Sequence, residues 1–176
     1  TKEGGADAAV ASINYISDGW YRCSLTSLCN ATVDDNINIF LCANDGFGTI
    51  SYEGDGVSGM FFWGGQLSPN SSPVDYVKTF DSVVTKAITA SPRYEEKGLL
   101  VEGSSTNLFL QSSNMQSGNW GKSGTFVPNV QEKSPSGAYD AVKLVEGVAG
   151  GAITTHLMVQ IVQFTAGEMT ASIYAK

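Results

Sequence analysis

The chain has 176 residues, of which 42% are hydrophobic and 15% are charged, so it carries enough apolar material to bury an ordinary core. Its formal net charge of −7 argues against a nucleic-acid surface, which needs clustered Lys and Arg, and against adsorption to an anionic membrane. No stretch approaches the roughly 18 apolar residues that suggest a transmembrane helix. We therefore expect a soluble protein that neither binds nucleic acid nor inserts into a membrane.

Alternation of apolar and polar side chains predicts half-buried strands at residues 21–25, 37–41 and 169–175, where the odd-numbered positions are apolar. Shorter apolar runs bounded by Gly, Pro, Asn or Ser predict further strands at 59–63, 98–101, 108–110, 141–145 and 156–164. The 20 glycines supply turns between them. About ten strands over this length predict an all-β, antiparallel β-sandwich of the jelly-roll kind without a long helix.

The alternating pattern weakens in the middle of the chain. A polar and charged stretch, Ser91-Pro92-Arg93-Tyr94-Glu95-Glu96-Lys97, precedes the apolar Gly98-Leu99-Leu100-Val101. We interpret residues 81–97 as a connector that divides the chain into two halves, residues 1–80 and 98–176.

Motifs from both halves resemble a recurrent module of phage tail-fibre and other virion proteins, often described as carbohydrate-binding-module-like or jelly-roll. They are Gly19-Trp20-Tyr21-Arg22-Cys23-Ser24-Leu25, Ser51-Tyr52-Glu53-Gly54-Asp55-Gly56 with Phe62-Trp63-Gly64-Gly65-Gln66-Leu67, and Gly98-Leu99-Leu100-Val101-Glu102 with Thr106-Asn107-Leu108-Phe109-Leu110-Gln111-Ser112. In the family, the strand containing the Thr-Asn-Leu sequence usually opens a module and the Gly-Trp-Tyr-Arg strand helps to close it. Here the closing half comes first and the opening half second.

The reversed order has two explanations. The chain is either the end of one module and the start of the next, or a permuted sandwich. Half a jelly-roll exposes unpaired edges and an apolar face, so we expect the halves to complete each other, within one chain or by strand exchange between chains. The chain lacks an initiator Met and a signal peptide, so we expect it to be a processed or excised part of a longer polypeptide.

The resemblance implies a non-enzymatic module of the virion surface: a fibre, spike or decoration that is assembled in the host cytoplasm and supports adhesion to host-surface glycans. Other virion proteins are the implied partners, and a homo-oligomer is expected, with trimers common in fibres. The alternative is a purely architectural capsid-decoration or tail-connector protein without a ligand.

Residues suited to catalysis are sparse. The single histidine, His156, lies in an apolar strand-like run, which favours a structural role, and no nucleophile elbow, P-loop or dinucleotide fingerprint is present. The acidic pairs Asp34 with Asp35 and Glu53 with Asp55 lie in turn-like sequence, where carboxylates are mostly solvated rather than paired for glycoside hydrolysis. We therefore expect no catalytic residues.

A calcium site is a weaker possibility in the glycine-rich turns. Asp45, Glu53 and Asp55 could supply oxygen ligands, but Asp-x-Asp-x-Asp spacing is absent and ordinary hairpin turns are the preferred interpretation. No cofactor is expected.

Aromatic side chains are the natural candidates for sugar recognition, because a pyranose packs its apolar face on a ring. Trp20 and Trp63 occupy strand positions that favour core packing. Phe47, Tyr52 and Trp120 lie in loop-like sequence and are therefore the predicted carbohydrate-binding residues.

Two amides and three cysteines complete the predictions. Gln66 and Asn107 lie within apolar strand motifs, so we expect them to satisfy backbone groups at the sandwich edge, with a sugar contact as the alternative. Cys23, Cys29 and Cys42 cannot all pair within the chain. Buried free thiols are the preferred interpretation, and a bridge from Cys42 to Cys23 or Cys29 is the alternative.

Overall fold

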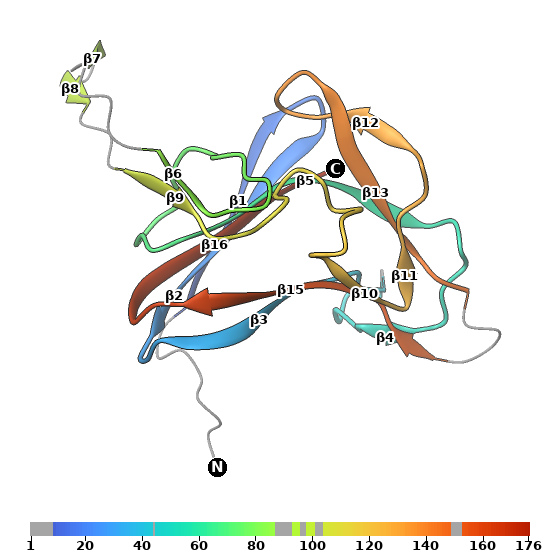
Figure 1. Cartoon of the computed structure of the whole chain (residues 1–176). Helices are drawn as coiled ribbons and strands as arrows, with labels where there is room; N and C mark the ends of the chain where they lie inside the picture. Colours follow the sequence, from blue (N-terminus) through green and yellow to red (C-terminus); the bar gives the residue numbers. More distant parts are fainter. Residues whose placement is uncertain (1–8, 44, 87–92, 96–97, 101–103, 149–152) are drawn as a thin grey trace.

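The computed structural model describes residues 9–43, 45–86, 93–95, 98–100, 104–148 and 153–176. These residues form antiparallel strands and turns without a helix, and the sheets pack together as a β-sandwich, as predicted (Figure 1).

The larger sheet has the strand order β1-β2-β16-β5-β13-β11, and β12 also pairs with β13. The bounds are β1 Ala9–Ser17, β2 Trp20–Cys29, β5 Gly59–Ser68, β11 Thr125–Phe126, β12 Gln131–Lys133, β13 Tyr139–Glu146 and β16 Gly167–Ala175. Asp18 (φ 49°) and Gly19 (φ 80°) join β1 to β2, and two successive positive φ angles are the geometry of a tight type I′ hairpin turn.

The smaller sheet has the order β10-β15-β3, with β10 Gly121–Ser123, β15 Leu157–Phe164 and β3 Val33–Phe40. Three short pairs lie outside the two sheets: β4 Ser51–Tyr52 with β14 Thr154–Thr155, β6 Val84–Lys86 with β9 Ser105–Asn107, and β7 Arg93–Glu95 with β8 Gly98–Leu100.

The main core lies between the two sheets. The larger sheet contributes Phe62, Leu67, Leu144 and Met169, and the smaller sheet contributes Met158 and Val162. The segment between β9 and β10 adds Phe109, Met115 and Trp120, and the first and last of these contact β5 at Gly65. As predicted, Ile37, Ile39 and Leu41 face this core.

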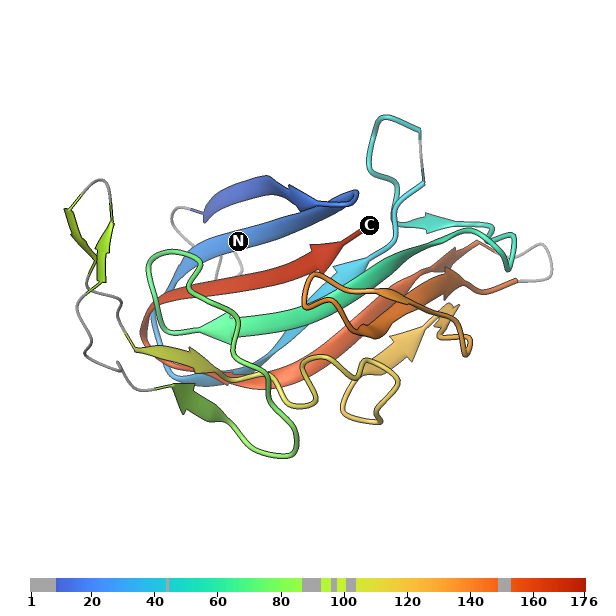
Figure 2. The ribbon, with the colours of Figure 1, turned by 90° about the horizontal axis from the view of Figure 1, so that it is seen from above.

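Each sheet contains strands from both halves of the chain. β16 lies between β2 and β5, β13 lies next to β5, and β15 pairs with β3 along its whole length (Figure 2). The early and late parts of this chain therefore complete one another within a single molecule. The expected connector, residues 81–97, contains β6 and β7, and its stretches at 87–92 and 96–97 lie outside the described residues.

Two local expectations are wrong. Residues 108–110 do not form a strand, because the side chains of Asn107 and Gln160 take hydrogen bonds from the backbone N–H groups of Phe109 and Leu110. The strand β16 is buried on both faces rather than one, because residues 69–79 cover its polar face: the Thr170 hydroxyl donates to the carbonyl oxygen of Asn70 over 2.7 Å.

The three cysteines are free. Cys23 and Cys29 are half-buried at the edge of the core, whereas Cys42 is exposed, so the expectation of a buried thiol is wrong for Cys42. Cys42 lies two residues after the end of β3, in the segment that leads to β4.

Candidate functional site

The outer face of the larger sheet carries a row of one arginine and two aromatic side chains. Tyr174 on β16 is the cross-strand partner of Arg22 on β2 and of Trp63 on β5. Cross-strand partners project from the same face of a sheet. Ile173 and Ala175, the neighbours of Tyr174, face the core, so this row points away from it.

A bulge in β5 directly follows Trp63. Gly64 has φ +62°, and the pairing between β5 and β16 shifts register between Ser172 and Tyr174. A Cβ atom on Gly64 would lie 3.0 Å from the Tyr174 ring, so a larger residue would crowd the row. Trp63 points outward because it follows the core-facing Phe62, and after the bulge Gly65 faces Phe109 and Trp120 in the core.

The segment after β5 adds a third ring. Gln66 accepts a hydrogen bond from the backbone N–H of Val77 over 2.7 Å and donates one to the carbonyl oxygen of Asp75 over 3.1 Å. These bonds fix Tyr76 between them, and its hydroxyl also bonds the Ser112 hydroxyl at 2.7 Å. The structure confirms that Gln66 satisfies backbone groups.

The three rings form one cluster. The ring centroid of Trp63 lies 4.5 Å from that of Tyr76 and 5.3 Å from that of Tyr174, with tilted and edge-on orientations that favour aromatic pairs. The Arg22 guanidinium carbon lies 5.5 Å from the Tyr174 ring centroid, which is within the range of a cation–π contact.

Charged groups border the rings. Asp140, in β13, places one carboxylate oxygen 3.8 Å from the Lys78 ammonium, with 27% and 45% of the two side chains exposed. Burial raises the pKa of Tyr76 to about 12, and the negative charge of Asp140 adds to the rise. The Tyr76 hydroxyl therefore stays protonated and can donate at neutral pH. We call Arg22, Trp63, Tyr76, Asp140 and Tyr174 the aromatic platform.

Three platform residues each hold a polar atom without a partner. Nε of Arg22, Nε1 of Trp63 and Oδ1 of Asp140 are buried and make no hydrogen bond to the described residues. They are the only such side-chain atoms in that part of the chain. Buried polar atoms nearly always find a partner in folded proteins, so two donors and one acceptor gathered around one cluster need an explanation.

The predicted sugar-binding residues lie elsewhere and do not form one site. Phe47 is 91% exposed on the loop before β4. Tyr52 is half-buried, and its ring lies 4.4 Å from the imidazole of His156. Trp120 is 1% exposed and packs on Phe109, so it is a core residue whose ring offers no face to a sugar.

The single histidine has a structural environment. His156 is completely buried, and its two ring nitrogens contact the carbonyl oxygens of Gly124 and of Tyr52, the latter at 3.0 Å. Because both nitrogens are occupied by backbone groups, neither can act on a substrate.

The acidic turn residues act as local caps. Asp55 accepts hydrogen bonds from the backbone N–H groups of Val57 and Ser58 at 2.7 and 2.6 Å, and Asp45 accepts from Phe47 and Gly48 in the same way. The described residues bring no three His, Cys, Asp or Glu side chains together in a group suited to a metal ion. Glu53 is exposed and belongs to no such group.

Sequence reasoning missed Arg22, Asp140 and Tyr174 as platform residues. The alternation in residues 21–25 and 169–175 does place Arg22 and Tyr174 opposite the core-facing side chains. It gives no cross-strand register, however, and these two residues meet only because β16 pairs with β2. Asp140 carries no local signal, because its relation to Tyr76 depends on the path of residues 69–79.

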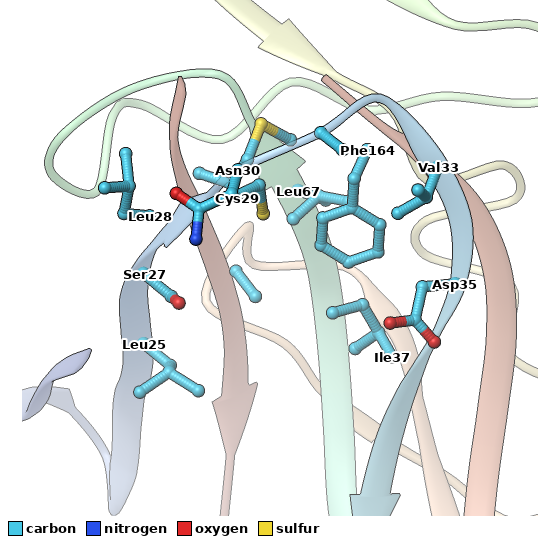
Figure 3. A pocket seen from close by; sticks show the side chains of 13 residues that line it. Leu25, Ser27, Leu28, Cys29, Asn30, Val33, Asp35, Ile37, Leu67 and Phe164 are labelled. Atoms are coloured by element: carbon cyan, nitrogen blue, oxygen red, sulfur yellow. The ribbon is translucent and has the colours of Figure 1, made fainter. Parts of the chain in front are cut away.

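A separate apolar pocket opens between the sheets where β2 leads into β3 (Figure 3). Its volume is about 450 Å³, and its lining includes Leu25, Cys29, Ile37 and Phe164. Among the described residues, Asp35 is the one charged side chain in its lining.

Comparison with protein-family models, curated proteins and solved structures finds no match to this chain. The described residues include no helix that could cross a lipid bilayer.

Proposed function

We propose that this chain is a non-enzymatic module of a phage virion surface, in a fibre, spike or decoration, and that it supports adhesion to host-surface glycans through the aromatic platform. The motif resemblance supports the virion assignment and its jelly-roll character. The observation that carries the adhesion proposal is the gathering of unpartnered Arg22 Nε, Trp63 Nε1 and Asp140 Oδ1 around the three rings.

The chemistry of the platform suits a sugar. A hydroxyl group both donates and accepts hydrogen bonds, so neighbouring hydroxyls can serve the two donors and the carboxylate oxygen. The half-buried rings of Tyr76 and Tyr174 provide apolar surface for the C–H face of a pyranose. The exposed Lys78 side chain borders the platform, with its ammonium 3.8 Å from Asp140 and 5.5 Å from the centroid of the Phe80 ring.

A glycan array probed with the intact chain tests this proposal. Binding to one class of glycan is expected, and Asp140→Asn should weaken it about tenfold or more, because the amide nitrogen replaces an acceptor of charged hydrogen bonds. The matched control is Phe47→Ala, which removes the most exposed aromatic ring outside the platform and should leave binding unchanged.

The outcomes separate the proposals. Absence of glycan binding, with retained attachment to virion partners, favours the purely architectural alternative. Loss of binding in Phe47→Ala with full binding in Asp140→Asn moves the site to the loop before β4 and overturns the platform assignment.

A further inference from the structure

The larger sheet extends beyond the smaller one on the side of β1 and β2. The larger sheet is six strands wide from β1 to β11, whereas the smaller sheet has three strands. β10 of the smaller sheet lies next to β11 of the larger sheet, so these two strands end their sheets on one side of the sandwich. On the other side, the smaller sheet ends at β3 and the larger sheet ends at β1. The inner face of β1 and the adjoining part of β2 therefore project past the edge of β3.

This projecting inner face is apolar. On β16, the residues Ala171, Ile173 and Ala175 face the core. Their cross-strand partners on β2 are Leu25, Cys23 and Tyr21, which therefore lie on the inner face of β2. Pairing with β2 then assigns Ala11, Ile13 and Tyr15 to the inner face of β1. We call these six residues of β1 and β2 the open face, and none of them is charged.

The side chains of the open face are more exposed than apolar side chains in the interior of a β-sandwich usually are. Ile13 is 72% exposed, Tyr15 62%, Leu25 49% and Tyr21 44%. These four side chains leave on the order of 500 Å² of apolar surface, near the upper end for the largest patch of a typical monomer. Leu25 also lines the pocket between β2 and β3, so the patch and the pocket are continuous.

Two free strand edges border the open face. Within the described residues, β1 pairs only with β2, and β3 pairs only with β15. Each strand therefore has one edge whose backbone N–H and C=O groups are not paired with another strand. The two edges have similar lengths, nine and eight residues. An exposed edge next to an apolar face is a template for another strand.

We infer that a second copy of this chain covers the open face. A two-fold axis relates the copies, the two open faces pack on each other, and β1 of each copy lies along the free edge of β3 in the other. This arrangement satisfies both edges and both faces with one self-complementary contact, as an isologous interface requires. A standard stable interface buries about 800 Å² on each partner, and the four exposed side chains alone supply more than half of that area.

Charge affects the two parts of this contact differently. The chain has a net charge of −7, which disfavours most contacts between copies, but the open face itself is uncharged. Asp35 lines the pocket and lies on the same face of β3 as Ile37. Charges on an edge strand oppose pairing, so Asp34 and Asp35, both exposed, work against the contact near the start of β3.

Sedimentation velocity on the intact chain, from about 1 to 100 μM, tests the inference in a range where a standard interface assembles. A concentration-dependent dimer is expected. Ile13→Glu should raise the dimer dissociation constant at least about 100-fold, because it places an unpaired charge in the contact. Since Ile13 is 72% exposed in the single chain, this variant should fold, which circular dichroism verifies.

The matched control is Ile161→Glu on β15. Ile161 is also 72% exposed, but it projects from the outer face of the smaller sheet. This control should leave the dissociation constant unchanged. A wild-type monomer at all concentrations, a trimer, or equal effects of the two variants would overturn the inference, whatever the outcome of the glycan experiment.

Discussion

The Nδ2 of Asn107 donates a hydrogen bond to the carbonyl oxygen of Gly65 over 3.0 Å, which ties β9 to the central strand β5. The same nitrogen donates to the carbonyl oxygen of Val77, while Oδ1 accepts from the backbone N–H groups of Leu67 and Phe109. Asn107 is completely buried, so its amide replaces ladder bonds that the backbone cannot make at this edge. The prediction that Asn107 serves the sandwich edge is confirmed.

Replacing this amide should therefore be costly. Asn107→Leu keeps a similar volume but leaves two carbonyl oxygens and two N–H groups unpaired in the interior, so the free energy of unfolding should fall by about 3 kcal/mol or more. Urea denaturation monitored by tryptophan fluorescence measures the loss. The exposed Asn129→Leu is the control, with an expected change below about 0.5 kcal/mol. Equal midpoints for the two variants would contradict this role.

Gly124 should tolerate no side chain. Its φ is +58°, and a Cβ atom would lie 2.4 Å from the carbonyl oxygen of Thr155, next to the His156 imidazole. Gly124→Ala should lower the free energy of unfolding by about 3 kcal/mol, because backbone strain adds to an overpacked contact. Gly118→Ala, which has open space around its Cβ position, should change it little. Thermal unfolding of the two variants compares them directly.

The turn at Asp55 should make stability depend on pH. Hydrogen bonds from Ser58 and Val57 hold the pKa of Asp55 well below its ordinary value. A folded-state pKa below the unfolded one gives stability that is complete above the ordinary Asp pKa of about 3.9 and is lost as pH falls towards the folded-state value. In Asp55→Asn the loss of unfolding free energy between about pH 5 and pH 3 should be smaller than in the wild type. Identical slopes in urea denaturation at these pH values would refute this coupling.

The three thiols should react in a fixed order. Cys42 is exposed, whereas burial raises the pKa of Cys23 and of Cys29, and the nearby Asp35 carboxylate raises that of Cys29 further. Since the thiolate is the reactive form, a maleimide should label Cys42 first at neutral pH. Asp35→Asn should speed labelling of Cys29 without affecting that of Cys23. Peptide mass spectrometry of a time course resolves the three sites, and slow labelling of Cys42 would contradict the described exposure.

The sequence by itself determined the all-β class and the faces of its clearest strands. Alternation in residues 37–41 correctly placed Ile37, Ile39 and Leu41 towards the core, because side chains of a strand project alternately to its two faces. Tryptophans in strand motifs were correctly expected to be buried, as Trp20 and Trp63 are. The sequence could also anticipate the pairing duties of Gln66 and Asn107, because an amide inside an apolar strand must find backbone partners.

Only the tertiary structure decided which strands and side chains are neighbours in space. Trp120 resembled a loop residue, but the segment between β9 and β10 folds over the larger sheet and buries it against Phe109. The aromatic platform arises because β16 inserts between β2 and β5 and brings Arg22, Tyr174 and Trp63 into one row. The open face arises because one sheet is wider than the other. Alternation reports on each strand separately, whereas strand order and sheet width depend on long-range pairing, which has no local signal in the chain.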